Sequence, residues 1–238
     1  MVCGQNLVEL GKAMHEYAQE HVGSLPPAAI SNEQEQASWD LKIKNYLPPK
    51  MPSAGDYYAD LRQRRAVTPI FKCPSDIERR REHEAPRSYA MPLYDPRRGG
   101  VQPSPESPTG VGIRFPDANF NECPLEGGRS PERVAQAASP PVVRLSLITE
   151  PADTLLLTEH VSPANALWNL SHATVVDTSD QLQSQMIGES AFHGGRFNYL
   201  MIDGHVEALT PIETVGHVGQ VGSNPATHYG IWTIRPGD

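Results

Sequence analysis

The stretch HGGRFNYLMIDGHVEALTP, residues 193–211, constrains the fold more than any other part of the sequence. Asp203 and Gly204 lie between two apolar runs. An Asp-Gly pair in that setting favours a two-residue type I′ turn, which needs positive φ at both positions. With this turn one face of the ribbon carries only apolar or aromatic side chains: Phe197, Tyr199, Met201, Val206 and Ala208. We predict an antiparallel hairpin over 196–209 with that face buried, since a one-residue slip would exchange the faces.

The first 23 residues have the pattern of an amphipathic helix. Leu7, Leu10, Met14 and Tyr17 recur at steps of three, four and three, with polar side chains on the opposite face. Gly23 stands in the usual C-terminal position. No Ser, Thr or Asp precedes the first periodic residue, as if a longer helix were entered midway. We predict a helix from the first few residues to about Gly23, packed on the apolar face of the hairpin.

Further elements are predicted between these two. Ser38 is a candidate N-cap for a helix that ends near Leu47, and the continuous apolar core of TLLLTE, residues 154–159, indicates a central strand. Other predicted elements are a strand and turn in 68–76, a strand in 87–94, and helices in 54–66 and 130–138. Residues 95–130 are rich in Pro and Gly and form a long loop excursion in this interpretation.

Composition points to one α+β domain, residues 1–238, with a modest core and long loops. Only 38% of residues are hydrophobic, and there are 23 prolines. The net charge of −8 argues against a nucleic-acid-binding surface, and the basic run at 78–82, flanked by acids, is interpreted as a solvated face. No run is long and apolar enough to cross a bilayer, and no signal peptide is evident. We expect a soluble chain without a nucleic-acid partner.

Three roles are open for His193, which precedes a Gly-Gly pair at the foot of the hairpin. It could hydrogen-bond a neighbouring backbone group or acid. It could bind a metal together with Glu159 and Asp203, and calcium suits such oxygen ligands better than zinc. It could act as a catalytic base, but the sequence has no G-x-S-x-G elbow and no phosphate-binding glycine loop after a strand. We assign no catalytic residue and expect no enzyme, since Asp203 also has a turn role that needs no chemistry.

Several motifs together resemble a bacterial family of pilin-like proteins, the prepilin-type processing-associated proteins with an H-x9-DG signature. That signature corresponds to His193, Asp203 and Gly204. The segment CGQNLVELGKAMHEYAQEHVGSLPP at 3–27 resembles the family's first helix. FKCPSD, RSYAMP and ITEPADTLLLTEH are similar to its later motifs and occur in the same order. Each motif alone is weak, but together they span residues 3–209.

The resemblance implies a pilin-like fold, in which a long N-terminal helix packs on an antiparallel sheet with long loop insertions. Residues 1–23 would be the C-terminal half of the pilin helix, and 192–209 the H-x9-DG hairpin. The family is related to the pseudopilins of type II secretion, which are non-enzymatic fibre subunits. The implied partners are other pseudopilin subunits, through the helix, and prepilin peptidase and the inner membrane for the full-length form. The implied location is periplasmic or otherwise extracytoplasmic.

The chain departs from the family because the cleavage motif and the apolar half of the helix, expected upstream of Cys3, are absent. Some pseudopilins bind calcium in a loop whose motif we do not find here. Extracytoplasmic exposure permits a disulfide. Cys73 and Cys123 both precede proline, and joining them would tie down the excursion; three free thiols are the alternative. Two other functions remain open: a secreted carbohydrate- or surface-binding module, and a hydrolase that uses His193 and nearby acids.

Overall fold

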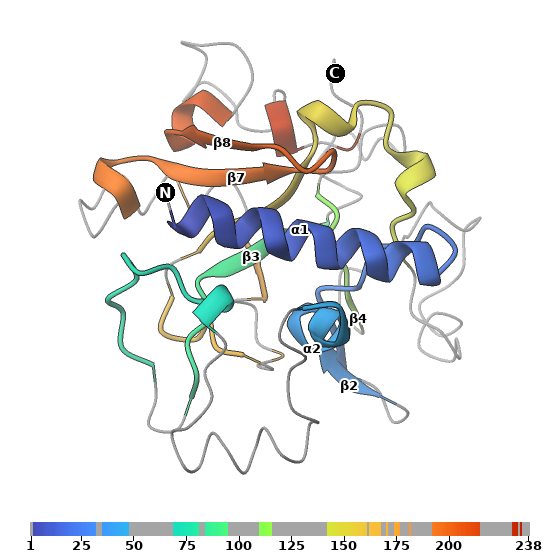
Figure 1. Cartoon of the computed structure of the whole chain (residues 1–238), viewed down its shortest axis with the longest axis horizontal. Coiled ribbons are helices and arrows are strands. Elements are labelled where there is room, and N and C mark those ends of the chain that lie inside the picture. The colour runs from blue at the N-terminus through green and yellow to red at the C-terminus, as the bar shows by residue number, and fades with distance from the viewer. Residues whose placement is uncertain are drawn as a thin grey trace, which may run out of the picture.

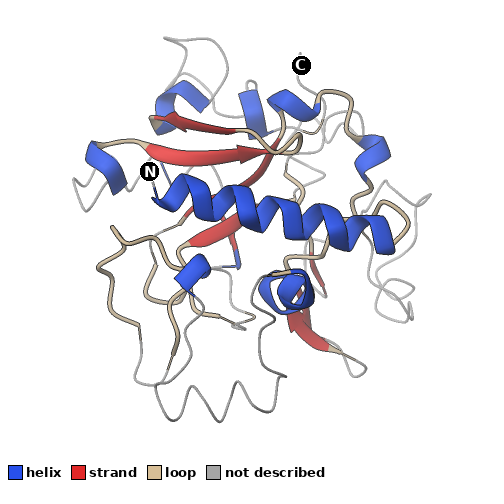
Figure 2. Ribbon diagram, viewed as in Figure 1, coloured by secondary structure: helices blue, strands red, loops and turns tan. Residues whose placement is uncertain are grey.

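The chain folds as an α+β protein, with a long helix lying in front of a five-stranded sheet (Figures 1 and 2). The structure is a computed structural model that describes residues 2–31, 35–47, 69–80, 84–94, 110–115, 142–160, 162–167, 170, 174–176, 181, 192–214, 230–232 and 234. The predicted helices at 54–66 and 130–138 and most of the 95–130 excursion lie outside these residues. None of the described helices has the length and apolar character needed to span a bilayer.

Helix α1, Val2–Glu20, confirms the helix predicted from the apolar repeat. Its buried face consists of Cys3, Leu7, Leu10, Gly11, Ala13, Met14, Tyr17 and Ala18. The helix crosses the sheet over β7, Phe197–Met201 (Figure 1). Leu200 comes so close that a Cβ on Gly11 would lie 2.9 Å from its Cδ2 atom. Glycine at position 11 therefore lets the helix approach the strand closely.

The sequence suggested that Gly23 ends α1, but the first residue after the helix in the left-handed conformation is Val22. Val22 has φ +55° and takes the first left-handed position after the helix, and Gly23 follows with φ +76°. The Gly23 N–H donates to the Ala18 carbonyl oxygen at 2.8 Å. This 6→1 bond is the one that defines the Schellman motif. A β-branched residue is unfavourable in that conformation because its Cβ crowds the backbone.

Val22→Gly is expected to stabilise the protein by about 1 kcal/mol, because relief of the left-handed strain exceeds the added freedom of glycine in the unfolded chain. Chemical denaturation of both proteins would measure this. Gln19→Gly is the matched control. It places the same residue in the last helical turn and should lower the free energy of unfolding by about 1 kcal/mol. Destabilisation by both substitutions would contradict the strained conformation of Val22.

The main sheet has the strand order β6-β3-β5-β7-β8. The strands are β3 (Tyr89–Pro92), β5 (Leu155–Glu159), β6 (Val175–Val176), β7 and β8 (Val206–Leu209). β6 pairs in parallel with β3, and the other pairs are antiparallel. β5 is central and all five of its residues are buried. The predictions of a strand in 87–94 and of a central strand in 154–159 are confirmed.

A second, smaller sheet has the order β2-β1-β4, from β1 (Ala29–Ser31), β2 (Gln36–Ser38) and β4 (Arg114–Phe115). Residues 110–115 belong to the predicted excursion, yet Val111 and Ile113 are buried in the core. An added Cβ at Gly112 would lie 2.7 Å from the Met91 Cβ atom, so glycine permits this segment to pass against β3. This part of the loop interpretation is therefore wrong.

The remaining elements are short. α2, Trp39–Ile43, continues as the 3₁₀ helix η1, Lys44–Tyr46, so the helix predicted after Ser38 is present. Ser38 holds the N-cap position but makes no capping hydrogen bond. The strand predicted within 68–76 is wrong, since this stretch begins as the 3₁₀ helix η2, Pro69–Phe71. Further 3₁₀ helices are η5 (Leu145–Leu147), η6 (Pro151–Asp153), η8 (Phe192–Gly194), η9 (Pro211–Thr214) and η10 (Gly230–Trp232).

The hairpin of β7 and β8 confirms the predicted turn site but not its register. Tyr199 pairs with Glu207, and the Met201 N–H donates to the His205 carbonyl oxygen at 2.9 Å. The loop therefore has three residues rather than two. Of its two predicted turn residues only Gly204 has a positive φ, +96°. This geometry is typical of a type I turn followed by a bulge glycine, which adds one residue to the loop.

The extra loop residue shifts β8 along β7, so Val206 shares a face with Leu200 rather than with Tyr199 and Met201, and this face packs on α1. An added Cβ at Gly4 of the helix would meet Val206, just as one at Gly11 would meet Leu200. Tyr199 faces the other way, where its ring lies edge-on to Trp232 at 6.4 Å between centroids. Burial of Phe197, Tyr199 and Met201 is confirmed. Their predicted packing on the first helix is wrong, because the strand carries apolar side chains on both faces.

Gly204→Val is expected to lower the free energy of unfolding by about 1 kcal/mol or more, since a β-branched residue resists positive φ. An added Cβ at Gly204 meets no atom within 4 Å, so the loss would be conformational rather than steric. Urea denaturation measures it. Glu207→Val, in the exposed part of β8, places the same side chain in an extended strand and should be nearly neutral. Equal midpoints for Gly204→Val and wild type would contradict the turn.

Candidate functional site

A disulfide bond joins the first turn of α1 to the turn after η2. It links Cys3 to Cys73, with the Cα atoms 5.0 Å apart, and both residues are buried. The predicted Cys73–Cys123 pair is therefore wrong; Cys123 lies outside the described residues. The reason is tertiary. α1 crosses the sheet so that its first turn meets the loop carrying Cys73, where the Asn6 side-chain amide donates to the Lys72 carbonyl oxygen at 3.2 Å.

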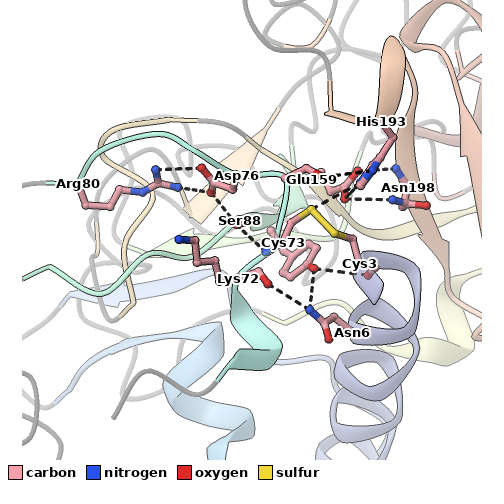
Figure 3. Close-up of a disulfide and its surroundings, with 12 residues drawn as sticks. Cys3, Asn6, Lys72, Cys73, Asp76, Arg80, Ser88, Glu159, His193 and Asn198 are labelled. Atoms are coloured by element: carbon pink, nitrogen blue, oxygen red, sulfur yellow. Dashed lines mark hydrogen bonds and ion pairs between the residues drawn. A yellow bond between two sulfur atoms is a disulfide. The ribbon is translucent and has the colours of Figure 1, made fainter. Parts of the chain in front are cut away.

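His193 lies at the foot of the hairpin and points towards the end of β5 (Figure 3). Its Nε2 atom is 3.0 Å from Glu159 Oε1. The residue has φ +50°, a left-handed conformation that is uncommon for a non-glycine residue. Such a conformation persists where the surrounding contacts determine it. Here it directs the imidazole inward, with 27% of the side chain exposed.

Glu159 is the last residue of β5, and its side chain is completely buried. Asn198 donates to it twice, from the backbone N–H to Oε2 at 2.7 Å and from the side-chain amide to Oε1 at 3.0 Å. Burial raises the pKa of the Glu159 carboxyl, and the hydrogen bonds from Asn198 and His193 offset part of that rise. A buried acid that accepts three hydrogen bonds from two residues is stabilised in place, because its polar atoms are satisfied.

The disulfide and the His193–Glu159 pair lie against one another. His193 Nε2 is 3.5 Å from Cys73 Sγ, and its Nδ1 is 3.5 Å from Ser75 Oγ. One ligand-type atom from each of four residues lies within 4.8 Å of the others. We call this set the histidine cluster: Cys3, Cys73, Glu159 and His193. It brings together the start of α1, the 73–76 turn, the end of β5 and the foot of the hairpin.

Asp203 is not part of this cluster. His193 and Asp203 lie beyond opposite ends of β7, so the three candidate metal ligands Glu159, His193 and Asp203 do not come together, and a calcium site there lacks the Asp203 carboxylate. Asp203 instead accepts hydrogen bonds from the His205 backbone N–H at 3.1 Å and ring Nδ1 at 2.6 Å. Burial alone would raise the pKa of Asp203, but the hydrogen bonds and charge of His205 together outweigh it and hold the pKa below its ordinary value. Asp203 and Gly204 are turn residues here.

A buried ion pair holds the 73–76 turn from the other side. Asp76 Oδ2 lies 2.6 Å from Arg80 Nη2 and accepts a hydrogen bond from the Ser88 hydroxyl at 2.6 Å (Figure 3). The Ser88 oxygen in turn accepts from the Cys73 N–H at 2.9 Å. The Arg80 side chain is only 2% exposed. The solvated face predicted for 78–82 is therefore wrong at Arg80, because a neighbouring buried acid draws its guanidinium inward.

A second buried ion pair connects α2 to the start of β3. Arg87 donates to Asp40 through Nη1, and both side chains are fully buried. Arg87 Nε also donates to Asn165 Oδ1 at 2.7 Å, and its guanidinium carbon lies 5.5 Å from the centre of the Trp39 ring. Such a pair is stabilising only when its hydrogen bonds are largely satisfied. These contacts fix the strand that borders the cluster.

His193 lies between Ser75 and Glu159, as the histidine of a hydrolytic triad lies between its nucleophile and its acid. The distances do not favour that chemistry. The 3.5 Å between Ser75 Oγ and His193 Nδ1 exceeds the 2.6–3.2 Å reach of a nucleophile and its base. A cavity of about 340 Å³ lies at the far end of α1, lined by Tyr17, His21 and Tyr46 among others. The cluster binds its own side chains together.

Sequence reasoning identified Glu159 and His193 but missed Cys3 and Asn198. Asn198 carried no signal, because a single polar residue within a strand is ordinary. Cys3 had one signal: it sits one turn before Leu7 on the apolar stripe of α1, which predicts that it faces the core. Its partner could not be read from spacing, since 70 residues separate the two cysteines.

Comparison of the chain with protein-family models, with curated proteins and with solved structures finds no match. A function therefore has to be inferred from the residues of this chain and their arrangement.

Proposed function

We propose that this chain is a structural subunit of a pilus-like fibre related to the pseudopilus of type II secretion, with a pilin-like form of the α+β fold. The observation that carries the proposal is the way α1 is attached to the rest of the protein. One face of the helix is buried on the sheet, and its first turn is covalently joined through Cys3 and Cys73 to the turn after η2. In a pilin-like subunit this helix transmits the fibre contacts to the globular part.

The exposed face of α1 supplies a surface that other subunits can contact. It is polar along most of its length, with Gln5, Lys12, Glu16 and Gln19 exposed. Lys12 is paired with Glu9 at 2.7 Å. Exposed ion pairs of this kind contribute little to folding. Charges on this face are thus available to set the register between neighbouring helices without loss of the fold.

The disulfide supports an extracytoplasmic location for the subunit. Disulfides persist in the periplasm and outside the cell and are rare in a reducing cytosol. The bond closes a separation of 70 residues, so it is a structural constraint of the kind found in secreted domains. In the proposal the full-length protein is held at the inner membrane by an apolar helix upstream of α1 and is processed by prepilin peptidase.

Photo-cross-linking of the full-length protein in its native cell tests the proposal. A photoreactive phenylalanine analogue at Lys12, on the exposed face of α1, should yield cross-linked multimers in the envelope fraction. The matched control is Ile77, which is 82% exposed but lies in the 73–80 loop. Assembly through the helix would be contradicted if the analogue at Lys12 gave only monomer. It would also be contradicted if the yield of multimers were equal at Lys12 and Ile77. The gene sequence upstream of Met1 should encode an apolar segment of roughly 20 residues.

The alternative functions have weaker support. A carbohydrate-binding module needs aromatic faces open to a ligand. In the cavity at the far end of α1 the Tyr17 ring stacks on His21 at 3.8 Å between centroids, and the Tyr46 hydroxyl donates to Glu20 at 2.6 Å. These rings are engaged within the protein. A hydrolase would require a different placement of Ser75 relative to His193.

A further inference from the structure

The histidine cluster contains the donor set of a zinc site. Two sulfur atoms, one imidazole nitrogen and one carboxylate oxygen lie within 4.8 Å of one another, from Cys3, Cys73, His193 and Glu159 (Figure 3). Three of these residues are buried, and His193 is the one that reaches the surface. Thiolate and imidazole ligands select zinc over calcium or magnesium, which prefer oxygen ligands.

The imidazole already lies close to both the carboxylate and one of the sulfurs. His193 Nε2 lies 3.0 Å from the Glu159 oxygen and 3.5 Å from the Cys73 sulfur. Asn198 holds the carboxylate from behind with two hydrogen bonds, and Ser75 Oγ lies 3.5 Å from the remaining imidazole nitrogen. Partners of this type orient metal ligands in many proteins, and each affects the affinity.

The backbone around the cysteines is held by contacts other than the disulfide. On the Cys73 side, the N–H of Cys73 donates to the Ser88 hydroxyl oxygen at 2.9 Å. On the helix side, the Asn6 amide donates to the Lys72 carbonyl oxygen at 3.2 Å. These contacts are expected to favour the same placement of the two segments when the S–S bond opens and zinc is bound. The sulfurs would have to separate to roughly 3.8 Å, the spacing that a tetrahedral ion with Zn–S bonds of about 2.3 Å requires.

We propose that, when Cys3 and Cys73 are thiols, these four residues bind one Zn²⁺ ion, and that the zinc and disulfide forms are mutually exclusive. A dithiol reductant converts the disulfide to two thiols and is itself oxidised to a disulfide, so two electrons and two protons pass to the protein. Zinc then displaces one proton from each thiol as the two Zn–S bonds form. Either form fastens the first turn of α1 to the turn that carries Cys73, and the zinc form adds the end of β5 through Glu159. This inference does not depend on the fibre proposal.

Zinc titration of the full 238-residue chain tests the site. The chain carries Cys123→Ser, so that only two cysteines remain, and is kept reduced with a phosphine that leaves metals largely free. Competition with a chromophoric chelator should give one Zn²⁺ per chain. Co²⁺ in place of zinc should show thiolate charge-transfer and tetrahedral d–d bands. The oxidised protein, with the same sequence, should bind no zinc at this site and show no such bands.

Variants separate a four-ligand site from simple dithiol binding. Even the loss of a residue that only orients a ligand typically weakens metal binding by about 10–100-fold. Because His193 and Glu159 are proposed as ligands themselves, H193Q and E159Q should each weaken zinc binding at least about tenfold. The matched control is H205Q, which removes an exposed histidine that already has two carboxylates nearby and should leave the affinity unchanged. Equal affinity of H193Q, E159Q and the parent would overturn the proposal, because the cysteines alone would then account for binding.

Folding of the reduced protein is followed in parallel by circular dichroism. If the reduced chain unfolds, added zinc should restore the native spectrum in the parent and not in H193Q, which supports the site through metal-coupled folding. A reduced chain that neither binds zinc stoichiometrically nor refolds with it would overturn the proposal. So would equal zinc binding by the oxidised and reduced forms.

Discussion

Replacing Cys3 and Cys73 together by serine is expected to lower the free energy of unfolding by about 4 kcal/mol. The bond closes a loop of 70 residues. In the chain-entropy description, loss of a constraint of this length frees the unfolded chain by that amount. Urea denaturation of the oxidised wild type and the double variant would measure the difference in midpoint. The effect is large relative to the 5–15 kcal/mol stability typical of folded domains.

Cys123→Ser is the matched control for this experiment. It changes the third cysteine without breaking the bond, so its midpoint should stay close to that of the wild type. Thiol counting in denaturant without reductant gives an independent readout of the bond itself. Three reactive thiols in the wild type, or a loss in Cys123→Ser as large as in the double variant, would contradict the Cys3–Cys73 pairing.

Arg87→Met is expected to destabilise the protein by about 3–5 kcal/mol, because it leaves Asp40 buried without its cationic partner. Thermal or chemical denaturation near neutral pH would show the loss. Lys12→Met provides a matched control on the exposed pair with Glu9 and should change stability by no more than about 0.5 kcal/mol. A loss of that small size in Arg87→Met would mean that Asp40 is not a buried charge.

The double variant Asp40→Leu, Arg87→Met distinguishes a lost attraction from a stranded charge. Removing both partners leaves no uncompensated ion, and replacing a buried pair by apolar residues is often nearly neutral. We therefore expect the double variant to be more stable than Arg87→Met alone. Equal or greater destabilisation in the double variant would show that hydrogen bonds such as the one from Arg87 to Asn165 matter more than the charge.

Elements with strong local patterns could be predicted from the sequence. The repeat of Leu7, Leu10 and Met14 predicts α1 because burial on one face requires that period. The apolar run of β5 predicts a central strand because only burial on both faces tolerates it. Asp203 and Gly204 mark the hairpin turn because few other residue pairs accept its geometry.

Features that depend on contacts between distant segments could not be predicted. An Asp-Gly pair fits both a two-residue and a three-residue hairpin loop, so it does not determine the register. Because Leu200 and Tyr199 are both large and mainly apolar, the hydrophobic pattern of the strand does not determine which of them faces α1. The pairing of Cys3 with Cys73 follows from where α1 crosses the sheet. The sequence predicts a surface charge at Arg80, because its contact with buried Asp76 forms only when the 73–80 loop is folded.

The covalent bond between α1 and the turn after η2 also determines how the molecule would carry a pulling force. A load applied at the N-terminus passes from Cys3 directly to Cys73, so residues 4–72 between them are bypassed. At about 3.5 Å per extended residue, this segment corresponds to roughly 240 Å of extended chain that does not bear the load. The force then enters near β3 and β5, in the middle of the main sheet, rather than peeling α1 from its surface. A subunit built this way would keep its helix seated under tension for as long as the bond remains oxidised.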